Sequence, residues 1–205
     1  MSTGLRERKK QQTRELIAEA ARRLFGECGF EAVTVAEIAR AADVSAQTVF
    51  NYFPTKEDLV YWRLESFEEE LLGTIRDRAP GEPVLAAFGR FVRAPRGMLA
   101  SYDPETRERL AALTRMIVSS PSLLAREQQI FEGYTRDLAE LLGGDIQARV
   151  AAGAMIAVHR ALVDFARERV LAGARDELAA EVGEQAEAAL SLLARGLGDY
   201  EGIPS

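Results

Sequence analysis

The chain has 205 residues and a net charge of −6; 47% of its residues are hydrophobic and 28% are charged. This composition fits one or two globular domains and excludes a disordered chain. A single cysteine, Cys28, excludes an intramolecular disulfide and a zinc site built from several cysteines. The longest nearly apolar run, residues 150–158, is far shorter than the roughly 20 residues of a transmembrane helix. We therefore expect no membrane partner. The first residues lack the apolar core of a secretory signal, which predicts a cytoplasmic protein.

The charge is unevenly distributed along the chain. Residues 1–60 hold nine Lys and Arg against nine Asp and Glu, whereas residues 61–205 hold 17 against 23. The first 14 residues form a basic arm with a net charge of +4. A neutral head with a basic arm, followed by an acidic body, is expected if only the head meets nucleic-acid phosphate. An ordinary solvated terminus would carry the same charges.

Nearly every segment has the apolar periodicity of an α-helix, and no segment alternates as a strand does. The first helix is expected from about Arg8 to Cys28, with Gly29 as its left-handed C-terminal residue. Its buried stripe is predicted to contain Leu16, Ile17, Ala20, Ala21, Leu24 and Phe25.

Two short helices are predicted next. Thr34 and Glu37 have the spacing of a capping box, which begins the second helix. Asp43 is expected to take the left-handed conformation in the turn that follows. Ser45 is then expected to cap a third helix that runs through Asn51.

The rest of the chain is predicted to be helical as well. A long fourth helix is expected from Lys56 to about Arg78, capped by Thr55 and joining head to body. Further helices are expected at about residues 84–93, 104–119, 122–142, 145–172 and 177–197. The predicted fold is all-α, with about nine helices in a head of residues 1–55 and a body of residues 56–205.

The two short helices, preceded by a longer one, are typical of a helix-turn-helix. In the third helix Val49 is expected to point inward with Val44 and Phe53, while polar and aromatic side chains face outward. Amide side chains can bond adenine edges in pairs, and a helix N-terminus can bind phosphate. A helical corner with a merely polar surface would have the same pattern. The residues expected to meet DNA are Thr34, Ser45, Ala46, Gln47, Thr48, Phe50, Asn51, Tyr52 and Lys56.

Residues 13–59 resemble the DNA-binding domain of the tetracycline-repressor (TetR) family. The resemblance rests on Thr13-Arg14, Ala20-Ala21, Leu24-Phe25, Gly29-Phe30, Thr34-Val35, Ile38-Ala39, Val44-Ser45, Thr48-Val49-Phe50, Tyr52-Phe53, Lys56 and Leu59. It implies that Thr34 touches phosphate, that the third helix reads bases and that Lys56 lies on the DNA backbone. Asp43 stands where the family usually has glycine. Asn51-Tyr52 replaces the more frequent tyrosine pairings, so the family's base preference is not carried over.

The resemblance also implies a body that dimerises and binds a small molecule. The last two predicted helices each have an apolar stripe interleaved with alanines, which permits a four-helix interface with a second copy. The same stripes could instead cover the core of one chain. We expect a homodimer, formed through these two helices, on a palindromic double-stranded DNA operator.

Aromatic and methionine side chains of the middle helices are candidates for an effector pocket, although each could belong to a plain core. The only histidine, His159, could be a structural residue, a polar handle for a ligand or, least favoured, a metal ligand. The body loosely resembles regulators of acyl-CoA-like ligands. The candidate ligand-binding residues are Phe67, Phe91, Tyr102, Met116, Phe131, Tyr134 and His159.

The resemblance thus implies a ligand-responsive transcriptional repressor, released from DNA by a small apolar or amphipathic effector. A DNA-binding or scaffolding protein without an effector is the alternative. An α-helical enzyme is disfavoured, because the sequence has no metalloprotease, nucleophile-elbow or phosphate-loop motif. We predict no catalytic residue, metal or cofactor.

Overall fold

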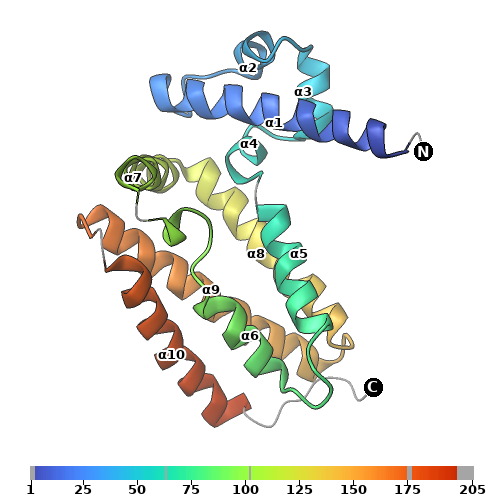
Figure 1. Ribbon diagram of the computed structural model, residues 1–205, viewed down its shortest axis with the longest axis vertical. Coiled ribbons are helices and arrows are strands. Elements are labelled where there is room, and N and C mark those ends of the chain that lie inside the picture. The colour runs from blue at the N-terminus through green and yellow to red at the C-terminus, as the bar shows by residue number, and fades with distance from the viewer. Residues whose placement is uncertain (1–2, 63, 102, 175–176, 198–205) are drawn as a thin grey trace. The chain divides into compact units, whose positions relative to one another are not determined.

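A computed structural model describes residues 3–62, 64–101, 103–174 and 177–197. These residues form ten α-helices, one 3-10 helix and no strand, which confirms the predicted all-α fold (Figure 1). The chain divides into two compact units. One contains Met1–Leu64 with Met116–Glu127, and the other contains Glu65–Arg115 with Gln128–Ser205.

The first unit is built on helix α1 (Thr3–Cys28), which begins five residues earlier than predicted and so includes much of the basic arm. Its buried stripe centres on Ile17, Ala21 and Phe25. Leu16 was predicted to lie in that stripe but is 61% exposed. The reason is helix geometry, because successive residues are rotated by about 100° and Leu16 lies beyond the edge of the stripe.

The helix-turn-helix consists of α2 (Val35–Ala41) and α3 (Ala46–Tyr52). Thr34 Oγ1 accepts a hydrogen bond from the Glu37 N–H at 3.3 Å, and the Thr34 N–H donates to Glu37 Oε2 at 2.8 Å. This is the predicted capping box. Ser45 Oγ likewise accepts from the Thr48 N–H at 3.0 Å. Asp43 has a φ of 54° and is the one described non-glycine residue with a positive φ.

Apolar packing holds these short helices in place. Seven-residue helices are unstable on their own in water, so burial has to supply most of their stability. Helix α2 packs against both α1 and α3. Ile38 of α2 and Val49 of α3 are fully buried, as is Phe53 directly after α3. The predicted inward face of the third helix is therefore confirmed for Val49 and Phe53, whereas Val44 is half-buried.

The prediction of a single long fourth helix over residues 56–78 is wrong. The structure instead has α4 (Asp58–Tyr61) and α5 (Leu64–Arg76). Trp62 follows α4 with helical dihedral angles, φ −56° and ψ −24°, and Arg63 lies outside the described residues. No proline or glycine in the sequence separates the two helices.

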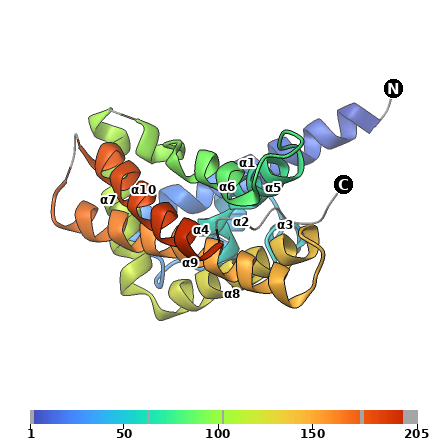
Figure 2. The same ribbon diagram turned by 90° about the horizontal axis from the view of Figure 1, so that it is seen from below.

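The second unit contains α5 and most of the remaining helices. Helix α10 packs along α9 and α6, and α6 also contacts α9 (Figures 1 and 2). The helices that complete the chain are α6 (Val84–Arg93), the 3-10 helix η1 (Gly97–Ala100), α7 (Pro104–Ser119), α8 (Pro121–Leu141), α9 (Ile146–Leu171) and α10 (Leu178–Leu197).

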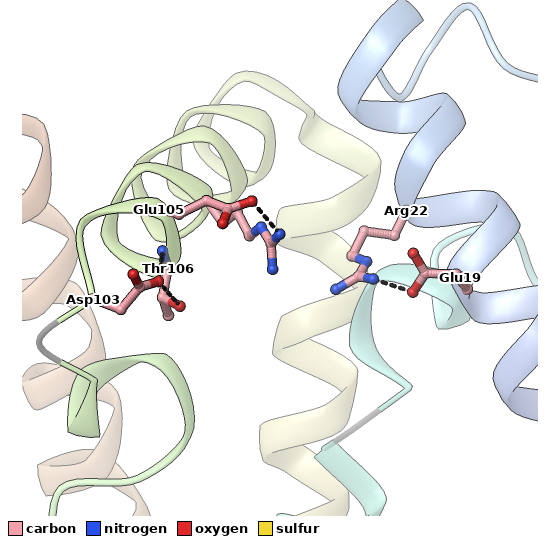
Figure 3. Close-up of polar contacts among 6 residues, drawn as sticks. Glu19, Arg22, Asp103, Glu105 and Thr106 are labelled. Carbon is pink, nitrogen blue, oxygen red and sulfur yellow. Dashed lines mark hydrogen bonds and ion pairs between the residues drawn. The ribbon is translucent and has the colours of Figure 1, made fainter.

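Hydrogen bonds define the start of α7, and ion pairs lie on the exposed faces of helices. The Thr106 N–H and hydroxyl donate to Asp103 Oδ2 at 2.8 and 2.7 Å, as expected for an N-cap (Figure 3). These bonds lower the pKa of the Asp103 carboxyl below its usual value. On α1, Arg22 pairs with Glu19 (Figure 3). Exposed pairs of this kind contribute little to stability.

Helix α9 is the one described helix that is long and apolar enough, by length and composition alone, to cross a membrane. One face of it is buried within the second unit, where Ala152, Met155 and Ile156 are almost fully covered. The core helix of a soluble protein meets the same criterion. Helix α9 packs against α10 and α6 within the second unit.

The left-handed residue in the turn gives a direct test of the local fold. We expect Asp43→Gly to raise the free energy of unfolding by up to about 1 kcal/mol, because glycine adopts a positive φ without steric cost. Asp43→Val should lower it by about 1–2 kcal/mol. Urea unfolding measures both changes. Ala42→Gly is the matched control, because Ala42 has a φ of −94° and glycine gains nothing there. An equal loss in Asp43→Gly and Ala42→Gly would contradict this reading.

Candidate nucleic-acid interface and aromatic cluster

The amide side chains of α3 lie on its exposed face. Gln47 and Asn51 are both exposed, one helical turn apart, and Gln47 Nε2 donates to Asn51 Oδ1 at 3.1 Å. The pair then offers Asn51 Nδ2 as a donor and Gln47 Oε1 as an acceptor. An adenine edge in the major groove presents one acceptor and one donor, so the pair is chemically matched to it.

The N-terminal end of α3 is compact and polar. Ser45 and Ala46 are exposed, and Thr48 is half-buried. The hydroxyls of Ser45 and Thr48 lie 2.8 Å apart and bond to each other. These hydroxyls hold the helix end in shape, and the small side chain of Ala46 leaves room for a groove wall to come close.

Two aromatic residues flank the amide pair. Phe50 is 46% exposed, which is unusual for a large apolar side chain, whereas Tyr52 is half-buried. An exposed apolar ring on a helix that enters the major groove can contact a thymine methyl group. The face of α3 therefore combines hydrogen-bonding and apolar groups suited to an A·T pair.

The cap of α2 places a carboxylate at a position expected to touch phosphate. Thr34 is exposed, but its hydroxyl donates to Glu37 Oε2 at 2.7 Å. Hydrogen bonds from the Thr34 backbone and side chain lower the pKa of Glu37, so its carboxylate is ionised at neutral pH. A phosphate contact by Thr34 remains a prediction, and it would lie beside this negative charge.

Lys56 supports the head from within. Its Nζ donates to the carbonyl oxygens of Phe30 at 2.9 Å and Val33 at 3.2 Å. The ammonium also lies 4.1 Å from the centre of the Phe30 ring, within range of a cation–π interaction. Lys56 thus stabilises the turn between α1 and α2, and its contact with the DNA backbone stays a prediction.

Five of the seven candidate ligand residues meet in the second unit. The Phe67 ring lies 4.5 Å from that of His159, 5.0 Å from Phe91 and 5.7 Å from Tyr134, measured between ring centres. The Phe131 ring lies 5.7 Å from His159 and 6.1 Å from Tyr134. We call these five residues the aromatic cluster. They come from helices α5, α6, α8 and α9, which the sequence alone does not bring together.

The structure does not test the other two candidates. Met116 belongs to the first unit and is half-buried there. Tyr102 lies outside the described residues. Their assignment to a ligand site stays a prediction.

His159 brings ring nitrogens into the cluster. Within the part of the chain that the structure describes, its ring makes stacking and edge contacts, and no hydrogen bond to it is seen. Burial, and secondarily the charge of Arg96, lowers the pKa of His159 to about 4. The imidazole is therefore neutral at pH 7 and offers one donor and one acceptor. No group of three or more metal-binding side chains occurs among the described residues.

Arg96 is a neighbour of the cluster that sequence reasoning missed. Its guanidinium lies 3.8 Å from the centre of the Phe91 ring, and its Nε donates to Glu70 Oε2 at 3.3 Å. Arg96 stands between Pro95 and Gly97 in a break between helices, where periodicity gives no signal. Arg96 therefore places a guanidinium, paired with the Glu70 carboxylate, near neutral His159.

Comparison with known proteins finds relatives of this chain in both sequence and structure. The family described as bacterial regulatory proteins, tetR family, matches residues 17–61. The HTH-type transcriptional regulator TcmR of Streptomyces glaucescens is 30% identical over 165 residues, which cover 78% of this chain and 73% of that protein. A TetR-family regulator from Streptomyces coelicolor A3 has a similar structure, with 26% identity and a TM-score of 0.54, covering 88% of this chain and 96% of that one.

The transcriptional regulator FadR of Bacillus subtilis, solved in complex with stearoyl-CoA, has a TM-score of 0.53. The match covers 86% of this chain and 97% of that one at 23% identity. At this identity the likeness concerns the fold.

The neutral state of His159 predicts a pH dependence of stability. The unfolded chain would protonate this histidine near its ordinary pKa of about 6.5, whereas the folded protein does so only near pH 4. The free energy of unfolding is therefore highest above pH 6.5 with respect to this histidine, and it falls as the pH drops toward 4. Between pH 7 and pH 5 we expect the wild type to lose roughly 2 kcal/mol more free energy of unfolding than His159→Phe. Urea unfolding at both pH values gives the difference, and equal losses in the two proteins would contradict it.

Proposed function

Since this chain belongs to the TetR family of bacterial transcriptional regulators, we propose that it is a repressor that binds a palindromic operator as a homodimer and is released by a small effector. Like its relatives, it is a DNA-binding regulator and not an enzyme. The observation that carries the proposal is the exposed amide pair on α3, presented by a capped helix-turn-helix. The site of action is the cytoplasm, where the DNA lies.

In the proposed complex α3 enters the major groove. Gln47 and Asn51 bond an adenine edge, and Phe50 packs on a neighbouring thymine methyl group. Lys9 and Lys10 are exposed on the first turns of α1, where their positive charges attract the DNA phosphates. The acidic residues of the chain lie in excess after residue 60, so the head is the part that DNA attracts.

The proposed dimer forms through α9 and α10. On α9, Ile146 is 73% exposed and Val150 is 55% exposed, and the small residues Ala157 and Ala161 are exposed further along the helix. On α10, Leu192 is exposed in a similar way. Exposed apolar side chains interleaved with alanine suit a close helix–helix interface. A two-fold dimer also places two recognition helices about one DNA turn, ~34 Å, apart.

The proposed effector binds at the aromatic cluster. Aromatic walls favour an apolar or amphipathic molecule, and the neutral imidazole of His159 provides one polar handle. Arg96 suits an anionic end of such a molecule. Stearoyl-CoA is the ligand found in the Bacillus subtilis FadR, and an acyl-CoA-like effector for this chain rests on resemblance alone.

Base reading by α3 is tested on an operator selected from random duplexes. We expect Gln47→Ala and Asn51→Ala each to weaken operator binding by about 1–3 kcal/mol and to relax the preference at one position of each half-site. Binding of the wild type should fall steeply between 50 and 200 mM salt, because phosphate contacts release counterions. Gln128→Ala is the matched control, since Gln128 is an exposed amide that also bonds a residue four positions on. If Gln47→Ala weakened binding to every sequence equally, α3 would not be reading bases.

The dimer interface is tested by placing a charge on the exposed face of α9. We expect Ala157→Glu to convert the dimer to monomers in sedimentation equilibrium, because a buried unpaired carboxylate is costly. Operator affinity should fall as well, since a monomer contacts a single half-site and binds it weakly. Ala112→Glu, at an exposed alanine of α7, should leave the dimer intact. A dimer that survives Ala157→Glu unchanged would contradict the proposed interface.

A further inference from the structure

The corner between α7 and α8 belongs to the same compact unit as the helix-turn-helix. Two of its side chains bond residues on either side of the helix-turn-helix. Ser120 Oγ donates to Glu31 Oε1 at 2.6 Å, and Arg126 Nε donates to Asp58 Oδ1 at 2.7 Å. We call residues 120–126 the corner segment.

A third contact lies in the interior of this unit. Tyr61, at the end of α4, donates from its hydroxyl to the backbone carbonyl of Leu123 at 3.1 Å. Both residues are buried. The corner segment is therefore packed into the interior of this unit as well as bonded at its surface.

The two side-chain contacts reach opposite ends of the helix-turn-helix. Glu31 lies three residues before the Thr34 cap of α2, and Asp58 is the first residue of α4, shortly after α3 ends at Tyr52. One short segment of this unit therefore holds the chain both where it enters and where it leaves the helix-turn-helix. Restraining both ends lowers the conformational freedom of everything between them.

Asp58 connects this restraint to the end of the recognition unit. Its Oδ2 accepts from the Thr55 N–H at 2.9 Å and from the Thr55 hydroxyl at 2.8 Å, while Oδ1 accepts from Arg126. The Asp58 side chain is 14% exposed and that of Arg126 is 34% exposed. Such a partly buried pair is screened less by salt than a surface pair. Arg126 therefore fixes the carboxylate that shapes the turn after α3.

We propose that Arg126 and Ser120 are positioning residues for operator binding, and that the corner segment clamps both ends of the helix-turn-helix. Arg126 acts through Asp58, and Ser120 acts through Glu31, with neither touching DNA. The proposal rests on operator recognition by α3, which binding of the wild type tests separately.

The test uses the full-length protein and the operator duplex selected with the wild type. Arg126→Gln should weaken operator binding about fivefold or more, a typical strength for coupling between sites. The slope of affinity against salt should not change, because no phosphate contact is lost. The same substitution in an Asp58→Asn background should change affinity less than twofold, since the group through which Arg126 acts has already been altered. Arg136→Gln is the matched control, because Arg136 is on the same helix and pairs with its sequence neighbour Asp137 at 2.8 Å.

Three results would overturn the clamp while wild-type binding stands. The first is an operator affinity of Arg126→Gln within twofold of the wild type. The second is an equal loss in the wild-type and Asp58→Asn backgrounds. The third is a salt slope reduced by about one phosphate contact, which would mean that Arg126 touches DNA.

A second pair of variants keeps the test valid if Arg126→Gln does not fold. Ser120→Ala and Glu31→Ala should each weaken operator binding, and the double variant should be no weaker than the stronger single one. Additive losses, or no loss in either single variant, would overturn the clamp. A wild type that selects no duplex at all would instead overturn the proposed function.

Discussion

Operator recognition depends on the way in which two seven-residue helices are held in shape. Neither is long enough to persist alone, so N-terminal caps and one left-handed residue define where each begins and how the chain turns between them. Thr34 and Ser45 provide the caps, and Asp43 provides the turn. Burial of Ile38 and Val49 then fixes which face of each helix remains outside.

Hydrogen bonds at the ends of these helices also determine which side chains can contact DNA. The hydroxyls of Ser45 and Thr48 bond each other, and Thr34 bonds Glu37, so these side chains shape the helix ends. The amides of Gln47 and Asn51 bond only each other among the contacts described for them, and they face outward. On α3, the polar side chains that shape the helix end are therefore different residues from those that are candidates for contacting DNA. A small helix can be rigid and still present a chemically distinct face.

Local signals in the sequence predicted the head well, because its caps are completed within four residues. Contacts between distant residues were not predictable in this way. The bond of the Lys56 ammonium to the carbonyl of Phe30, 26 positions away, had no signal in the sequence, and the expected contact of Lys56 with the DNA backbone stays a prediction. Arg126 and Asp58 are 68 positions apart, and no periodicity links them. In the body the aromatic residues were identified by type, but their meeting around His159 depends on how four helices pack.

Methylation interference on the selected operator would decide whether the exposed face of α3 reads the major groove. Methyl groups at guanine N7 project into the major groove, and those at adenine N3 project into the minor groove. If α3 of each subunit lies in the major groove, N7 methylation should block binding within two patches whose centres are about one helical turn, ~34 Å, apart. Interference confined to adenine N3, or a single patch without two-fold symmetry, would contradict it.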